Sequence, residues 1–136
     1  DVLHSMKERK AGVPESVPRV AREEILAARE VIEEEVFVAP EILEAIVDIA
    51  ANTRGDQRAL QGLSTRALVL MVPALRARAL GQMRSYVSAE DLQELAEVVF
   101  AHRLELSPGA ETPEEVIRDC SVRPLETLAQ ASIRWR

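Results

Sequence analysis

A segment in the middle of the chain, Gly62-Leu63-Ser64-Thr65-Arg66, has the residue types of an anion site. Ser64 is a favourable N-cap for the apolar stretch that follows it, and Arg66 would then lie in the first helical turn. A cation is unfavourable there by about 0.3–1 kcal/mol, because backbone dipoles already make a helix N-terminus positive. A phosphate would remove this penalty by accepting hydrogen bonds from backbone N–H groups, the cap hydroxyl and the guanidinium.

The charge distribution supports a second interpretation of Arg66. The chain has 15 Arg, two Lys and a net charge of −6, and residues 51–86 contain six arginines against one acidic residue. Residues 20–50 carry a net charge of −7 and residues 87–136 a net charge of −5. The arginines could therefore pair with glutamates on neighbouring helices instead of binding a small anion. Physical chemistry alone leaves both interpretations open. The six arginines are Arg54, Arg58, Arg66, Arg76, Arg78 and Arg84.

The other potentially reactive residues favour structural roles. His102 suits the negative end of a helix, and Cys120, with no adjacent His, is expected to be a small, partly buried residue. The consecutive glutamates 33–35 do not share one helix face, so they indicate a solvated surface rather than a metal site. Arg54 and Arg58 could extend an anion site or belong only to a loop. We therefore predict no catalytic residue and no metal ligand.

Length and composition exclude several classes of protein. A chain of 136 residues that is 47% apolar and 29% charged predicts one soluble, cytoplasmic domain. The acidic net charge and only four aromatic residues argue against nucleic-acid binding, and no apolar run is long enough to span a membrane. A single cysteine excludes an internal disulfide, and the lack of a GxxxxGK[ST] motif excludes a complete nucleotide hydrolase. Because the first residue is Asp1 rather than Met, we expect a fragment of a longer protein.

Apolar periodicity predicts an all-α fold, a small bundle of four main helices. The third helix is apolar on every side over residues 67–75, so we expect it to be the central and most buried one. Pro73 removes one backbone hydrogen bond from that helix and is expected to kink it. The expected ranges of the four helices are about 22–35, 40–53, 64–81 and 88–103.

Shorter segments complete the expected organisation. Residues 36–38 and 85–87 are β-prone and could form at most a minimal two-strand pairing. Residues 52–63 are polar, contain two glycines and are expected to form a loop. The C-terminal part predicts two short helices, from residue 112 to about 119 and from about 124 to 133.

Four stretches of the sequence, in this order, resemble the C-terminal lid of MoxR-type AAA+ ATPases. They are Val36-Phe37-Val38-Ala39-Pro40 continuing to Asn52-Thr53-Arg54, Gly62-Leu63-Ser64-Thr65-Arg66-Ala67, Tyr86-Val87-Ser88-Ala89-Glu90-Asp91-Leu92 and Val99-Phe100-Ala101-His102-Arg103-Leu104. The resemblance implies a lid-like helical domain over residues 20–107, a linker or arm over 1–19 and a C-terminal helical extension over 108–136. The sequence departs from the family pattern at Thr65 and Ala89, where the family has proline, and at Pro73.

The resemblance also implies a function. Arg66 would be the sensor 2 residue, which reaches the γ-phosphate of ATP, with Ser64 and Thr65 at the same helix N-terminus. ATP and Mg²⁺ would be bound by a core domain N-terminal to this chain, in a parent protein that forms a hexameric ring. Such proteins are chaperone-like and remodel or activate partner complexes, with a von Willebrand A-type protein as one possible partner. The fragment alone is expected to bind no cofactor and to be non-catalytic, because it has no phosphate loop and no Mg²⁺-binding motif.

A second hypothesis keeps the helical fold but not the nucleotide. The chain would then be a free-standing protein-interaction module that docks through its acidic helices. Both hypotheses exclude nucleic acid and membranes as partners.

Overall fold

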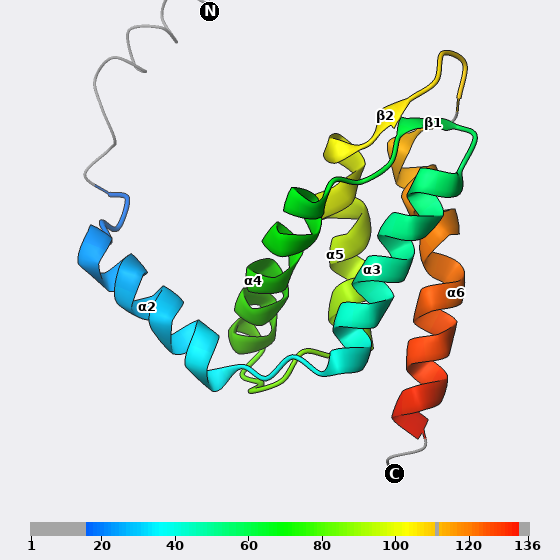
Figure 1. Cartoon of the computed structure of the whole chain (residues 1–136). Helices are drawn as coiled ribbons and strands as arrows, with labels where there is room; N and C mark the ends of the chain where they lie inside the picture. Colours follow the sequence, from blue (N-terminus) through cyan, green and yellow to red (C-terminus); the bar gives the residue numbers. More distant parts are fainter. Residues whose placement is uncertain (1–15, 111, 134–136) are drawn as a thin grey trace, which may run out of the picture. The chain divides into compact units, whose positions relative to one another are not determined.

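Helical periodicity in the sequence corresponds to five α-helices in the part of the chain that the structure describes, residues 16–110 and 112–133 (Figure 1). The structure is a computed structural model. The all-α prediction is confirmed, and the arm expected over residues 1–19 lies outside the described residues except for its last four. The helices are α2 (Arg22–Glu35), α3 (Pro40–Gly55), α4 (Thr65–Gly81), α5 (Ala89–Phe100) and α6 (Pro113–Ile133), with a 3₁₀ turn η1 (Ala101–Arg103) after α5.

The chain divides into two units, residues 1–30 and 31–136, and helix α2 crosses the boundary between them. Helix α2 begins and ends where its apolar spacing predicts. At its start the Ala21 N–H donates to Glu24 Oε2 over 2.8 Å, and the acidic first turn suits the positive end of the helix dipole. None of the described helices is long and apolar enough to cross a membrane.

Helix α3 contributes the largest share of the core in the second unit. Pro40 occupies its first turn, as expected, and the helix ends two residues beyond the predicted Thr53. Its most extensive contacts are with α6, which lies beside it in Figure 1. The buried residues of α3 are Ile42, Ala45, Ile46, Ile49, Ala50 and Thr53.

Helix α4 is less buried than predicted. Only Ala67, Met71, Leu75 and Ala79 are buried, at a constant spacing of four residues, whereas Val69 is 65% exposed. The prediction that this is the most buried helix is therefore wrong, because only one face of α4 packs into the core. The helix is continuous from Thr65 to Gly81, and the kink expected within it stays a prediction.

The C-terminal residues form one helix, not the two that we predicted. Helix α6 continues through Pro124, which is itself buried. An internal proline costs a helix about 3 kcal/mol, but α6 also places Val116, Ile117 and Leu128 in the core. Burial of this apolar face, at about 1.5–3 kcal/mol per large side chain, outweighs the cost of the proline.

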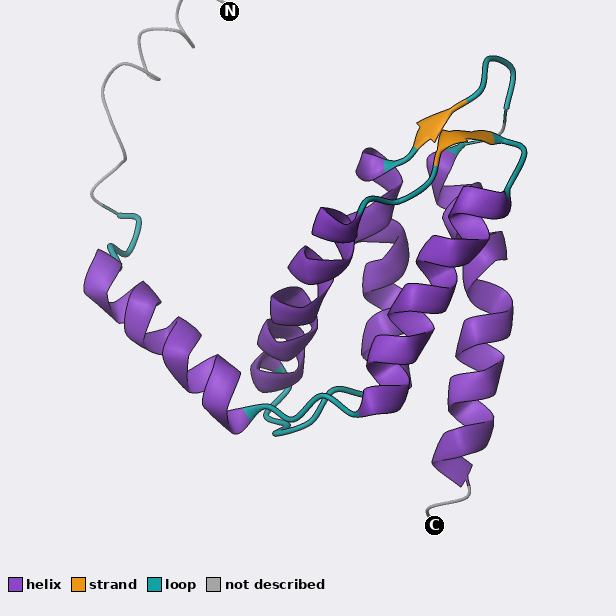
Figure 2. Cartoon of the chain, viewed as in Figure 1, coloured by secondary structure: helices purple, strands orange, loops and turns teal. Residues whose placement is uncertain are grey.

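Two minimal strand contacts accompany the helices (Figure 2). Strands β1 (Ala59–Gln61) and β2 (Glu105–Leu106) pair antiparallel, so the loop expected over residues 52–63 is wrong in part: it contains β1 and the end of α3. The pairing expected between residues 36–38 and 85–87 is an isolated parallel bridge between Phe37 and Tyr86.

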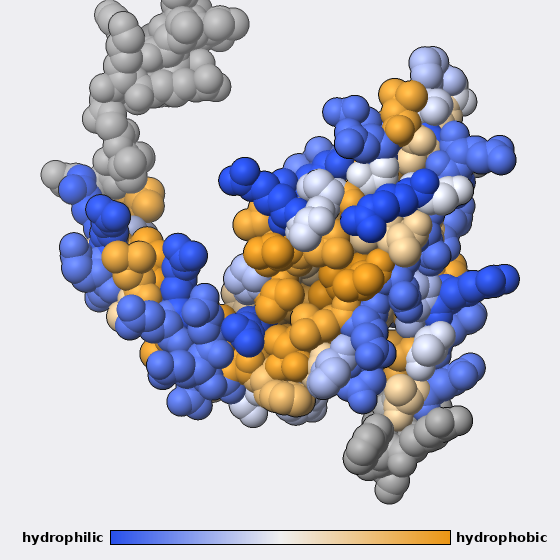
Figure 3. Space-filling model, in the orientation of Figure 1, coloured by the Kyte–Doolittle hydropathy of each residue, from blue (hydrophilic) through white to orange (hydrophobic). Residues whose placement is uncertain are grey.

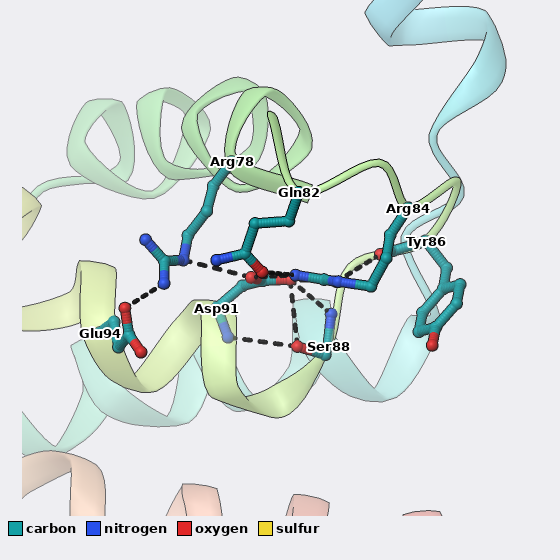
Figure 4. A network of polar contacts seen from close by, with 7 residues as sticks. All are labelled: Arg78, Gln82, Arg84, Tyr86, Ser88, Asp91 and Glu94. Carbon is teal, nitrogen blue, oxygen red and sulfur yellow. Dashed lines mark hydrogen bonds and ion pairs between the residues drawn. The ribbon is translucent and has the colours of Figure 1, made fainter. Parts of the chain in front are cut away.

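A buried carboxylate, Asp91, joins the end of α4 to the start of α5 (Figure 4). It forms a capping box with Ser88, whose N–H donates to Asp91 Oδ2 over 2.8 Å. Arg84 donates to both carboxylate oxygens over 2.8 and 2.6 Å, and Arg78 Nε lies 3.2 Å from Oδ1. Burial raises the pKa of Asp91, but hydrogen bonds from Arg84 and Ser88 outweigh it and hold the pKa below its usual value.

We expect Asp91→Asn to lower the free energy of unfolding by about 3 kcal/mol, because it removes a buried carboxylate and leaves two half-buried guanidinium groups without their counter-charge. Urea unfolding followed by circular dichroism measures this change. Glu94→Gln is the matched control, since Glu94 also pairs with Arg78 but is 60% exposed, and its loss should be under about 1 kcal/mol. Equal losses for the two variants would contradict the assigned role of Asp91.

Candidate functional site

The N-terminus of α4 carries the predicted site residues Ser64, Thr65 and Arg66, all of which are exposed. Ser64 has the extended backbone of an N-cap, with φ −75° and ψ 156°, and its Oγ accepts from the Ala67 N–H over 3.3 Å. The cap predicted from sequence is therefore present. Because the Ser64 hydroxyl satisfies one backbone donor, the remaining N–H groups of the first turn stay available to an external acceptor.

Two arginines of the basic segment, Arg66 and Arg76, have no ion pair or hydrogen bond among the described residues, and of these two only Arg66 lies in the first turn of α4. Arg58, Arg78 and Arg84 make ion pairs with carboxylates, as the pairing interpretation expects. Within residues 16–110 and 112–133, Arg66 makes no hydrogen bond or ion pair. This region thus contains a cation at the positive end of a helix with no local counter-charge, which is the arrangement an anion would stabilise.

Hydrogen bonds from the end of α3 fix Leu63, the residue that precedes the N-cap Ser64. The hydroxyl of buried Thr53 accepts from the Leu63 N–H over 3.1 Å, and Arg54 Nη2 donates to the Leu63 carbonyl over 3.1 Å. The Leu63 side chain is fully buried. Two consecutive residues of α3 therefore fix the backbone from which α4 begins.

Gly62 allows this close approach of loop and helix. A Cβ at this position would lie 2.4 Å from Arg54 Cγ, 2.6 Å from Arg54 Cα and 2.7 Å from Arg54 N. Two of these three atoms belong to the backbone of α3, which cannot move aside as the end of a side chain could. The first residue of the predicted anion segment, Gly62, is thus required for packing against α3.

The same end of α3 is tied to α6. Asn52 Nδ2 donates to the Cys120 carbonyl over 2.8 Å. Arg58 links Asp56 to Asp119, with ion-pair distances of 2.8 and 2.9 Å. Arg58 holds the pKa of Asp56 at about 2, and burial raises the pKa of the Cys120 thiol to about 11, so the thiol stays protonated at neutral pH. Cys120, predicted to be a small and partly buried residue, is buried in the structure.

The remaining sequence candidates lie elsewhere. His102 is exposed on η1, with its ring Nδ1 3.2 Å from the Val98 carbonyl, and glutamates 33–35 are exposed on α2. Among the described residues, no group of three or more His, Cys, Asp or Glu is placed to hold a metal ion. A hollow between α5 and α6, lined by residues such as Ala96 and Val122, contains none of the predicted site residues.

Sequence reasoning identified the cap and the arginine but missed Thr53 and the role of Gly62. The signal for Ser64 is local, since a cap precedes an apolar helical stretch. The contact between Thr53 and Leu63 joins residues ten positions apart and depends on how the loop returns to α3. The helix N-terminus thus brings the Ser64 cap, Thr65 and the exposed Arg66 together within one turn.

Comparisons with known proteins match this chain to one domain family, one curated relative and one solved structure. Residues 51–120 match the family described as "AAA lid domain". The chain is 35% identical over 134 residues to a Bacillus subtilis protein named "Uncharacterized protein YeaC", covering 98% of this chain and 41% of that protein. The fold is similar to a crystal structure of a "putative ATPase" from Cytophaga hutchinsonii, with a TM-score of 0.69 and 24% identity over 77% of this chain and 35% of that one. The chain thus spans about two fifths of the YeaC relative.

We expect Gly62→Ala to lower the free energy of unfolding by about 1–3 kcal/mol, because the added methyl group forces the loop away from α3. Urea unfolding of the variant measures the loss. Gly55→Ala serves as the control, since a Cβ there meets nothing within 4 Å, and it should change stability by less than about 1 kcal/mol. A Gly62→Ala variant as stable as the parent would refute the close packing assigned to this loop.

Proposed function

Because the chain belongs to the AAA lid domain family, we propose that it is the lid of a MoxR-like AAA+ ATPase. The lid closes over ATP and Mg²⁺ bound by a core domain that this chain does not include. Arg66 acts as sensor 2 and contacts the γ-phosphate, with Ser64 and Thr65 at the same helix N-terminus. The observation that carries the proposal is the exposed guanidinium of Arg66, without a partner among the described residues, in the first turn of α4.

The electrostatics of this helix end favour a phosphate ligand. The backbone dipoles and Arg66 place positive charge at one point, and the cap residue Ser64 carries no charge. A terminal phosphate group, with a charge of about −2 and several free oxygens, offers several acceptors to a guanidinium fork and to backbone N–H groups at once. Since the phosphate is held by another domain, binding would draw the lid toward that domain, and hydrolysis would release it.

The exposed face of α4 supports closure onto a partner domain. Val69, Leu70 and Pro73 lie three, four and seven residues after Arg66, so they share its side of the helix. Val69 is 65% and Leu70 40% exposed, and Figure 3 shows a broad apolar surface over α4. A helix that presents Arg66 to a phosphate must bring these side chains against the domain that holds it. Apolar surface of this kind is typical of an interface.

An AAA lid domain belongs to a longer protein with an AAA+ core on its N-terminal side. We propose that this parent protein is cytoplasmic, forms a hexameric ring and, in the manner of a chaperone, remodels or activates partner proteins, one of which is of the von Willebrand A type. The resemblance of the sequence motifs to MoxR-type lids supports these assignments. The fragment alone contributes no hydrolytic group.

The first test removes the proposed sensor. In the full-length parent protein, we expect Arg66→Ala to lower kcat/KM for ATP by about 10–100-fold, because one charged donor to the transferring phosphoryl group is lost. Steady-state phosphate release measures the effect. Arg123→Ala, which removes an exposed arginine from α6, is the control and should leave turnover unchanged. Unchanged hydrolysis and nucleotide affinity in Arg66→Ala would refute the sensor assignment.

The second test concerns the apolar face. We expect Val69→Ser in the parent protein to raise KM for ATP by about tenfold, the equivalent of about 1.5 kcal/mol of apolar burial lost on closure. Val98→Ser on α5 is the matched control, because Val98 is 69% exposed and Val69 is 65% exposed. Thermal unfolding should be similar for both variants, since neither side chain is buried in the lid. An equal KM for the two variants would contradict docking through this face.

A further inference from the structure

We propose that Thr53 is a positioning residue for nucleotide sensing, whose buried hydroxyl sets the backbone position from which Arg66 is presented. This inference rests on the proposed function of Arg66. Within the described parts of the chain the Arg66 side chain makes no hydrogen bond or ion pair, so no polar contact holds it and its backbone position largely decides where it is presented. The backbone position of Arg66 depends in turn on that of Leu63, the residue just before the N-cap Ser64.

The hydroxyl of Thr53 has a fixed polarity. It donates its hydrogen to the Ala50 carbonyl over 2.8 Å, one turn earlier in α3. Its oxygen is therefore left as an acceptor, and the Leu63 N–H donates to it over 3.1 Å. Thr53 and Leu63 are both fully buried, so water cannot replace either partner in this contact.

Residue 63 is restrained on every side. Its N–H is held by Thr53 and its carbonyl by Arg54, its side chain is buried, and the preceding Gly62 packs directly on the α3 backbone. Three residues later comes Arg66, in the first turn of a helix whose start Ser64 fixes. A shift at Leu63 is therefore transmitted to Arg66 without an intervening flexible segment.

Such a shift matters for catalysis more than for binding. A guanidinium fork contacts phosphate oxygens in a defined geometry, and displacement of a reacting or stabilising group by about 1 Å can lower a rate about 100-fold. Thr53 touches no substrate in this arrangement and acts only through Leu63 and the helix that follows.

The test is a double-mutant cycle in the full-length parent protein, with Thr53→Val, Arg66→Ala and the combined variant. Valine keeps the shape of threonine but cannot accept the Leu63 N–H. We expect Thr53→Val to lower kcat for ATP hydrolysis about tenfold, and Thr53→Ser, which keeps the hydroxyl, to stay within about twofold of the parent. In the Arg66→Ala background, Thr53→Val should have no further effect, because the group that it positions is gone.

Two controls separate positioning from general stability. Thr127 Oγ1 donates to the Arg123 carbonyl over 3.0 Å, as Thr53 does to Ala50, but Thr127 is exposed. Thr127→Val should therefore leave kcat unchanged. If thermal unfolding shows that Thr53→Val does not fold, Arg54→Gln is the second variant that tests the positioning role. Arg54 is exposed, and its substitution removes only the hydrogen bond to the Leu63 carbonyl. We expect it to lower kcat about threefold, and only when Arg66 is present.

The outcomes distinguish this inference from the proposed function. An Arg66→Ala variant with normal hydrolysis refutes the sensor role itself. If Arg66→Ala is defective in hydrolysis, the sensor role stands. The positioning role of Thr53 is then overturned if Thr53→Val lowers kcat equally with and without Arg66, or lowers it in neither case. Loss of the Thr53→Val effect in the Arg66→Ala background supports it.

Discussion

The structure depends on the contact between the last turn of α3 and the chain that returns to start α4. Here Thr53 and Arg54 hold both backbone groups of Leu63, and Gly62 lies against the α3 backbone at a distance that no side chain would permit. The same turn of α3 reaches α6 through Asn52, whose amide donates to the Cys120 carbonyl. The end of α3 therefore contacts both the start of α4 and the middle of α6. Because these contacts are buried or hydrogen-bonded, they fix the start of α4 relative to the core.

Helix α4 has apolar residues on two faces, one buried in the core and one exposed, and neither face alone would require a helix that is apolar on every side. Its buried residues, spaced by four, pack toward the core of the lid, whereas Val69 and Leu70 face outward on the side of Arg66. A helix that is apolar all round is normally expected inside a protein. In a lid, the same pattern arises if the second face is covered only when the domain closes onto its partner. The error in the predicted burial of α4 is therefore informative about function.

Local signals in the sequence predicted much of the fold. The caps at Ser64 and Ser88, and the proline that begins α3, each depend on a few adjacent residues, and all are present in the structure. The pairing of β1 with β2 and the continuity of α6 through Pro124 depend on residues distant in sequence. A two- or three-residue strand carries no periodicity, and the cost of an internal proline is offset by tertiary burial. The candidate site shows the same difference between local and distant signals. Arg66 could be identified from its neighbours in sequence, whereas the role of Thr53 depends on a contact with Leu63, ten residues away.

The arginines of the basic segment show why the pairing and the anion-binding interpretations were both needed. Arg58, Arg78 and Arg84, half of the six arginines in this segment, each have a carboxylate partner, so these three contribute to folding. Arg84 and Arg78 meet at a single buried carboxylate that also caps α5. Arg66 lies where the helix dipole opposes it and has no such partner within the described residues. A cation at this helix end is unfavourable by itself, and an anion that approached the start of α4 would make its position favourable, which is why the proposed phosphate contact accounts for Arg66 where the pairing interpretation does not.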